Sequence, residues 1–338
     1  MPFNRRTFIT TATAGLAALT SVRARAATAA PEMLSRATAA LATLSAAQQQ
    51  TALFEFNDPL RAGWNYMLGS RRAPGLALED MDPAQKEAAL ALLATALSAE
   101  GFEKAQNIML QQDILRDEWR KGSPDRNRER FSLMIFGTPQ PGSAWGWRWE
   151  GHHLSISITL IGDQILSATP NAFASEPNTV PSGPHKGLVV LKEEEVLGRQ
   201  LYTDLSSSAR STALVNDESP GNVLTLQGRE GRYDGDTRGL PLSDMTQSQR
   251  DMALRLIEVY TAEPFAAAIA EPRRARLQAG DLEATRFIWA GADLDRGPIY
   301  YRLHGPDLLI EFASLRNQPL HLHTASHEPG HNLGAAGL

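Results

Sequence analysis

A short segment occurs twice in this chain in closely similar form, and each copy precedes what reads as the same helix. The two copies are Gly75–Met81 (GLALEDM) and Gly239–Met245 (GLPLSDM). Each is followed by the spacing of a capping box, in which the first side chain bonds a free helix N–H and the third helical residue reaches back. The two capping pairs are Asp82 with Gln85 and Thr246 with Gln249. This spacing predicts helices over residues 83–98 and 247–261.

The similarity continues on both sides of these helices and in the same order. Residues 44–53 resemble 205–214, and residues 148–154 resemble 302–308. Each copy therefore reads as helix, loop, helix and then strands. We predict an α+β fold of two similar halves, each a helical hairpin plus antiparallel strands, produced by an internal duplication and packed together. The halves would span residues 27–180 and 181–338, and chance similarity among common helix caps is the alternative.

The first 26 residues predict a twin-arginine signal peptide rather than part of the fold. Residues 4–9 (NRRTFI) resemble such a signal, a mild apolar run follows over 11–19, and residues 24–26 (ARA) supply small side chains for cleavage. The run is too short and too rich in Thr and Ala to predict a stable membrane span. We therefore expect a periplasmic or secreted protein whose export partner is the twin-arginine machinery.

Composition excludes several kinds of site. The net charge of −5 gives no general attraction to nucleic acid, and no basic cluster with interleaved aromatic residues is present. The chain has no cysteine, so a metal would have to use His, Asp, Glu or carbonyl oxygen. The sequence also has no Gly-rich phosphate loop, no Gly-x-Ser-x-Gly elbow and no His-Glu-x-x-His helix.

Near the carboxyl end, the sequence predicts a β-hairpin that carries a carboxylate and two imidazoles. Residues 308–312 and 320–324 alternate like strands, and residues 316–319 have the composition of a turn. A turn centred near Arg316 would place Glu311 directly opposite His321, with His323 on the same face. These groups suit a metal site or an acid/base pair. A one-residue slip would move Glu311 to the other face, and two half-exposed histidines on an edge strand are the alternative.

In the first half, residues 145–160 alternate between apolar and polar positions. Even positions from 154 to 160 are expected to face the core, while Trp147, Trp149 and His153 are expected on a shared aromatic and polar face. If the halves pack about a pseudo-twofold axis, this face and the equivalent face that bears Glu311 could meet in one cleft. The tryptophans would then line a substrate pocket, although packing is their commoner role. His152 points the other way and reads either as a ligand or as a hydrogen-bonded core histidine.

Arg148 and Arg302 occupy matching places in the two copies. Either could hold an acidic ligand in the substrate pocket, although an arginine beside a strand usually forms a structural ion pair. After the predicted hairpin, His327 and His331 either extend the site or belong to a flexible tail.

Several segments together resemble a bacterial exported family known only as domain of unknown function 3500. The resemblance covers nearly the whole chain after the signal, and the segments are Trp145–Ser155, Pro170–Phe173, Glu176–Pro177, Phe287–Gly291, Tyr300–Arg302, Ile310–Phe312 and His321–Thr324. The family name carries no activity, so the resemblance supports the segmentation but implies no reaction.

The leading hypothesis is an exported metal-dependent enzyme that acts on a small molecule. His321, His323 and Glu311 would bind zinc, iron or manganese, with His153 or His152 completing the set, and the reaction would be a hydrolysis or an oxidation. Glu311 and His153 are the candidate catalytic residues. A non-catalytic periplasmic protein that binds a small molecule or metal is the second hypothesis, and metal-free acid/base catalysis by Glu311 and a histidine is the third.

Overall fold

The computed structural model describes most of the chain from residue 31 onward. The described residues are 31–68, 71–119, 125–225, 233, 235–292, 294, 297–316 and 318–335. The predicted twin-arginine signal lies outside them. Within these ranges, no helix has both the length and the apolar character needed to cross a membrane.

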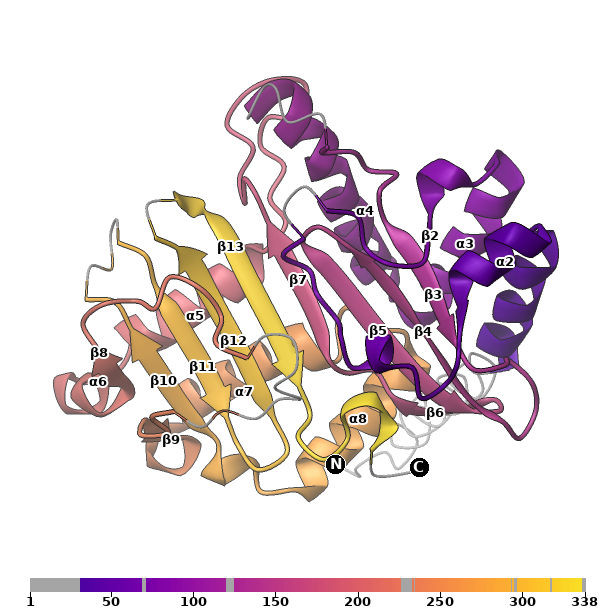
Figure 1. The fold of residues 1–338 in the computed structure, drawn as a ribbon. Coiled ribbons are helices and arrows are strands. Elements are labelled where there is room, and N and C mark those ends of the chain that lie inside the picture. Colours follow the sequence, from indigo (N-terminus) through magenta and orange to yellow (C-terminus); the bar gives the residue numbers. More distant parts are fainter. Residues whose placement is uncertain are drawn as a thin grey trace, which may run out of the picture.

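One mixed sheet runs through the whole molecule (Figure 1). Within the described ranges it has thirteen strands, in the order β1-β3-β4-β5-β7-β13-β12-β11-β10-β8, with β2 also paired to β3, β6 to β5 and β9 to β10. The strands are β1 (Leu53–Phe54), β2 (Leu76–Ala77), β3 (Ser132–Phe136), β4 (Ala144–Gly151), β5 (Leu154–Ile161), β6 (Gln164–Ser167), β7 (Asn171–Ser175), β8 (Leu214–Asn216), β9 (Leu240–Pro241), β10 (Arg286–Ala290), β11 (Tyr300–His304), β12 (Leu309–Leu315) and β13 (Gln318–His327).

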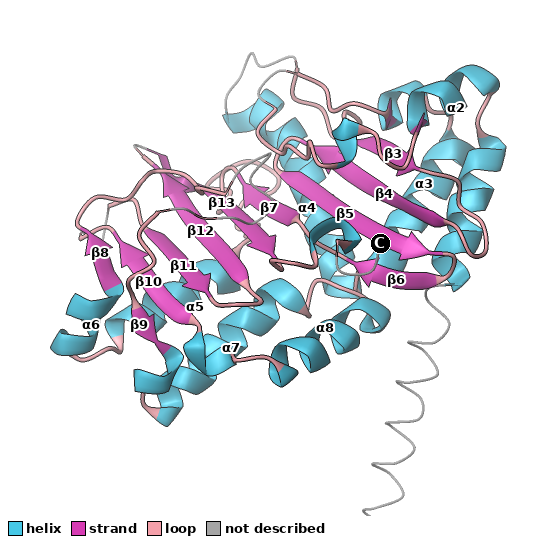
Figure 2. Cartoon of the chain, turned by 60° about the horizontal axis from the view of Figure 1, so that its bottom comes forward, coloured by secondary structure: helices cyan, strands magenta, loops and turns pink. Residues whose placement is uncertain are grey.

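Helices cover one face of this sheet, as the turned view in Figure 2 makes clear. Residues 31–43 are helical. The other helices are α2 (Ala46–Ala52), α3 (Pro83–Ala96), α4 (Ala99–Ile114), α5 (Lys192–Thr203), α6 (Ser207–Ala213), α7 (Gln247–Thr261) and α8 (Ala267–Ala279). Their apolar side chains form one continuous core with the covered face of the sheet. This arrangement confirms the α+β class.

Both predicted capping boxes are present. The Asp82 side chain accepts from the N–H of Gln85, the Thr246 side chain accepts from the N–H of Gln249, and each glutamine bonds back to its cap. As a result α3 and α7 begin where the sequence predicts. α3 ends two residues earlier than expected because Ser98 caps α4, accepting from the N–H of Gly101.

The two ends of the sheet have the same pattern of strand pairing. β1 pairs parallel with β3, and β8 pairs parallel with β10 at the opposite end. Both β3 and β10 also pair antiparallel with a two-residue strand, β2 and β9 respectively. β7 and β13 meet at the centre as antiparallel neighbours. This order is compatible with an internal duplication, which stays a prediction.

The predicted face of the tryptophans is wrong. β4 and β5 form a hairpin whose turn is His152-His153, and Trp147 pairs with Ile158 while Trp149 pairs with Ile156. Directly paired residues share a face, so the indoles lie with the isoleucines in the core under the helices. The prediction assumed one continuous strand over residues 145–160, but His152 and His153 form a turn, so the alternation of faces does not continue through them.

The register predicted for the carboxyl-terminal hairpin is also wrong. Glu311 pairs with Ala325, and His323 pairs with Ala313, because a bulge between Ser314 and Leu315 shifts the pairing. The net displacement from the predicted register is an even number of residues. Glu311 therefore lies on the predicted face of the sheet, which it shares with His323. It is two residues away from His323 along the strand direction and not directly opposite it.

Two loops cover the sheet face that the helices leave open (Figure 1). Residues 55–68 follow β1, residues 217–225 follow β8, and together with alanines of the sheet they form a second apolar cluster. Each loop is held by a buried glutamate of the sheet. Glu150 accepts a hydrogen bond from the N–H of Asn65, and Glu311 accepts hydrogen bonds from the N–H groups of Leu224 and Thr225.

Candidate metal centre

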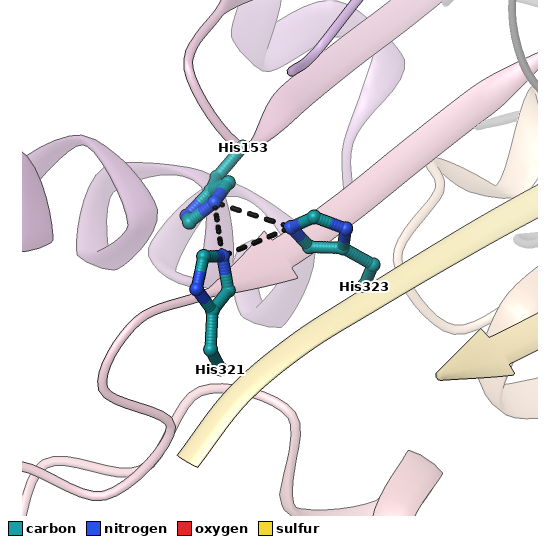
Figure 3. A group of neighbouring side chains, drawn as sticks. All are labelled: His153, His321 and His323. Atoms are coloured by element: carbon teal, nitrogen blue, oxygen red, sulfur yellow. Dashed lines mark hydrogen bonds between the residues drawn. The ribbon is translucent and has the colours of Figure 1, made fainter. Parts of the chain in front are cut away.

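Three imidazoles point toward one another (Figure 3). They lie where β7 and β13 pair at the centre of the sheet, on the face that the loops cover. The Nε2 atom of His321 lies 2.9 Å from Nε2 of His153 and 3.0 Å from Nε2 of His323, and the third side of the triangle is 3.4 Å. His153 and His323 are 1% and 3% exposed, and His321 is 9% exposed. We call these three residues the histidine triad.

Backbone contacts fix His153 in the β4–β5 turn. Its φ is 74°, a left-handed conformation that a residue with a side chain rarely adopts. Its N–H donates to the carbonyl of Tyr66 (2.8 Å), and its carbonyl accepts from the N–H of Ala174 (2.8 Å). These two hydrogen bonds hold the turn against β7 on one side and against the 55–68 loop on the other.

A small residue makes room for the triad. β7 lies between the β4–β5 turn and β13, and Ala174 of β7 pairs with His323 while it also bonds His153. The small side chain of Ala174 therefore leaves room for the imidazoles of His153 and His323 to approach each other. The triad draws one histidine from the first predicted half and two from the second.

Asn222 defines the protonation of His323. Its Oδ1 accepts from the N–H of Val223 (2.8 Å), which identifies that atom as the amide oxygen. The same oxygen lies 2.8 Å from Nδ1 of His323, so Nδ1 must carry the proton. In the neutral ring, Nε2 then presents a lone pair to the other two histidines.

His321 has the same arrangement. Its Nδ1 lies 2.9 Å from Oε1 of Gln318 and 3.3 Å from a carboxylate oxygen of Glu176. Both neighbours are acceptors, so Nδ1 donates and Nε2 again presents a lone pair. Outer hydrogen bonds of this kind orient histidines that bind metals and raise their basicity.

Burial keeps two members of the triad, His153 and His323, in the neutral form. Burial lowers the pKa of His153 well below its usual value, and the neighbouring His152, His321 and His323 lower it further. Burial, followed by the proximity of His321, lowers the pKa of His323 in the same way. Neutral imidazole is the form that binds metal ions.

The family profile described as "Protein of unknown function (DUF3500)" matches residues 26–334. The chain belongs to the DUF3500 family. No curated protein and no solved structure matches it. The expected membership of this family is therefore confirmed, while its bacterial and exported character stays a prediction. The family name adds no activity to the geometry of this DUF3500 chain.

Glu311 lies outside the triad. Its carboxylate accepts from the N–H groups of Leu224 and Thr225 (2.8 Å each), from the Thr225 hydroxyl and from the Tyr300 hydroxyl (2.7 Å). These contacts occupy the carboxylate in anchoring the 217–225 loop to the sheet. Within the described residues, the close group of potential ligands is the three histidines alone.

His152 also stays apart from the converging atoms. Its ring stacks on that of His153 with 3.6 Å between centroids, and its Nδ1 lies 2.9 Å from Oε1 of Gln112. Of the two histidines proposed to complete the ligand set, His153 is the one beside His321 and His323.

The four residues predicted to line a substrate pocket lie in different parts of the structure. Trp147 and Trp149 pack in the core, a position that does not support contact with a substrate. Arg148 donates to the carbonyls of Leu60 (2.7 Å) and Arg61 (3.2 Å) and pairs with Glu150, so it holds the first loop. Arg302 lies in the matching strand of the second half and lines a cavity.

The two late histidines belong to the fold of the DUF3500 chain and not to a tail. β13 extends to His327, which is fully buried with its ring 5.5 Å from that of Trp64, and His331 directly precedes a short 3-10 helix (Asn332–Gly334). Neither residue belongs to the triad.

Sequence reasoning did not find the residues that orient the triad. Gln318 and Glu176 contact His321, Asn222 contacts His323, and Ala174 separates His153 from His323. Gln318 lies close to the His-x-His pair in sequence and could have been suspected. Asn222 lies 101 residues from His323, and no local pattern identifies it.

Proposed function

We propose that the histidine triad binds one divalent transition-metal ion and that the protein is a metal-dependent enzyme acting on a small molecule. The observation that carries this proposal is the convergence of three Nε2 atoms, two of which present lone pairs because their Nδ1 atoms donate elsewhere. Two lone pairs 3.0 Å apart repel each other unless a cation or a proton lies between them.

The spacing suits an ion between the three rings. Tetrahedral zinc with Zn–N bonds of about 2.0–2.1 Å implies nitrogen separations of about 3.3 Å. The separations here are 2.9, 3.0 and 3.4 Å. An all-imidazole set favours zinc or iron over manganese, which prefers oxygen ligands.

Hydrolysis is the reaction that the donor set supports best. Three neutral ligands leave the full charge on the ion and leave a position open, so the ion would supply Lewis acidity and acidify a water molecule near neutral pH. An oxidation would need iron at the same three histidines. A non-catalytic metal-binding protein is the remaining alternative.

Metal analysis of the natively produced protein tests the proposal. We expect about one zinc or iron per chain after removal of weakly bound ions, and less than a tenth of that in His323→Ala. His185→Ala is the matched control, since His185 lies in the 181–187 loop and is not among the converging histidines, and this variant should retain its metal. Equal metal content in the wild type and His323→Ala would refute the proposal.

A metal-free cluster is the second candidate, and one observation favours it. Nδ1 of His153 has no hydrogen-bond partner among the described residues, so His153 could carry its proton on Nε2 and share it with the other two rings. Protein free of metal, with activity that chelators leave unchanged, would favour this acid/base cluster.

We further propose that the protein reaches the periplasm or the exterior through the twin-arginine machinery. Residues 4–9 support this, and their replacement by NKKTFI should leave the protein in the cytoplasm, as fractionation would detect. We also propose that the two halves arose by duplication, which the repeated segments and the matching strand order support.

A further inference from the structure

A partly open cavity lies beside the 217–225 loop, apart from the triad. It is a cavity of about 260 Å³ whose walls include Arg302, Tyr233, Ile288 and Ala290. Arg302 is on β11 and is 1% exposed. The cavity is therefore built around a buried cation.

Among the described residues, no carboxylate oxygen lies within ion-pair distance of the Arg302 guanidinium, and the buried carboxylate of Glu311 is linked to it only through the Tyr300 hydroxyl. One Nη atom donates to the Tyr300 hydroxyl (3.1 Å), the other donates to the carbonyl of Asp236, and Nε has no partner. Both acceptors are uncharged. A buried guanidinium whose Nε has no acceptor is unfavourable, so its position in the wall of a cavity points to a ligand that brings an acceptor group to that nitrogen.

The matching arginine of the first half has the partner that Arg302 lacks. Arg148 lies on β4, and its Nε is 3.0 Å from a carboxylate oxygen of Glu150, two residues further along the strand. The residue two positions after Arg302 is His304, which carries no negative charge. Glu311 pairs with Arg302 across the strands, but its oxygens bind the loop and Tyr300.

The carboxylates that line the cavity within the described residues have other partners. Asp236 pairs with Arg238 (2.6 Å), and Glu218 lies 4.0 Å from Arg316 at the exposed rim. Neither is within ion-pair distance of Arg302. Nε of Arg302 is therefore a buried donor at the cavity that has no acceptor among the described residues.

The remaining walls define the body of the ligand. Val215, Leu224, Ile288 and Ala290 contribute apolar surface, and the Tyr233 ring lies 3.6 Å from the Arg302 guanidinium carbon. A carboxylate matches the planar fork of arginine, and an apolar body matches the walls. The volume limits the ligand to a small molecule.

We propose that this cavity binds a small carboxylic acid with an apolar body, and that Arg302 is the residue that binds its carboxylate. The proposal is independent of the metal, because no residue of the triad lines the cavity wall that carries Arg302.

Calorimetric titration with benzoate tests the proposal, with benzamide as an uncharged ligand of the same shape. We expect benzoate to bind at least tenfold more tightly than benzamide, and Arg302→Gln to weaken benzoate binding at least tenfold. Arg199→Gln is the control, since Arg199 is on α5 at the helical side of the sheet. Ala290→Leu fills the cavity and should also abolish binding without removing the charge, so it remains informative if Arg302→Gln does not fold.

Equal binding of benzoate and benzamide, or full benzoate binding by a folded Ala290→Leu protein, would overturn the proposal. Binding of inorganic phosphate in preference to benzoate would also overturn it, because the site would then serve a phosphate. The His323→Ala protein should bind benzoate as the wild type does, so failure of the metal proposal leaves this test intact.

Discussion

Single hydrogen bonds determine what the triad can bind. Nε2 of His323 faces the other rings as a lone pair because Asn222 accepts the proton of Nδ1, and Asn222 is oriented in turn by the N–H of Val223. The same ring in its other tautomer would present a proton and could not bind a metal. Asn222 therefore determines, together with His323 itself, whether the imidazole can bind a metal at this place.

Replacing Asn222 tests this dependence. Asn222→Leu removes the acceptor with little change in volume, and we expect metal affinity to fall about 10- to 100-fold, as is typical when an outer partner of a ligand is lost. Competition with a chelator of known affinity measures the change. Asn222→Asp keeps an acceptor at the same place and should retain the affinity, so equal losses in both variants would contradict the tautomer argument.

His327 should make the fold sensitive to acid. Burial lowers its pKa from 6.5 to about 4, even though the charge of Glu311 acts in the opposite direction. In the unfolded chain this imidazole is protonated below about pH 6.5, whereas in the folded chain it is protonated only below about pH 4. The contribution of neutral His327 to the free energy of unfolding is therefore fully present above pH 6.5 and is lost as the pH falls from 6.5 to 4. The loss from this residue is about 2 kcal/mol between pH 7.5 and pH 5.

Urea unfolding at the two pH values measures the effect. His327→Gln cannot titrate, so its free energy of unfolding should fall by about 2 kcal/mol less than that of the wild type over the same interval. An equal fall in both proteins would mean that His327 does not titrate differently on folding.

At the scale of elements, β7 sets the distance between the parts of the triad. It is the strand between the β4–β5 turn and β13, and its Ala174 lies between His153 and His323. The alanines of this face also let the two loops approach the sheet closely. A larger side chain on β7 would occupy the space in which the rings meet.

Ala174→Val should therefore reduce metal binding at least tenfold, and metal analysis after dialysis would detect the loss. Ala172→Val is the matched control, since Ala172 lies two residues earlier on the same face of the same strand and is equally buried. Both variants overpack the face and should lose about 1–3 kcal/mol of stability. Full metal content in Ala174→Val would show that the imidazoles do not meet across this residue.

At the scale of the whole molecule, the triad joins the two predicted halves. His153 comes from residues 27–180, while His321 and His323 come from 181–338, and the halves meet where β7 pairs with β13. Each half would have an unpaired strand at that edge if it were alone. The site therefore depends on the association of the halves.

A cut in the exposed 181–187 loop tests this dependence. The co-expressed fragments 27–183 and 184–338 should reassemble and bind one metal ion per pair, because the cut spares every ligand and the β7–β13 pairing. Neither fragment alone should bind the ion tightly. Tight binding by the first fragment alone would place the ligands elsewhere.

Local interactions made part of the fold predictable. The capping residues Asp82 and Thr246 act on N–H groups three positions away, so the starts of α3 and α7 follow from the sequence directly. The shared face of His321 and His323 follows equally from the period of a strand. The faces of Trp147 and Trp149 could not be assigned this way, because two turn residues reset the alternation.

The class of the fold, the starts of the main helices and a His-x-His pair on one strand face were predictable, since each depends on neighbours within a few residues. The register of β12 on β13, which a bulge sets, and the meeting of His153 with His321 across 168 residues depend on the packing of distant segments. The same packing makes Glu311 the anchor of a loop and brings Asn222 to His323. These are long-range contacts, and their partners are fixed by the packing of the strands and loops.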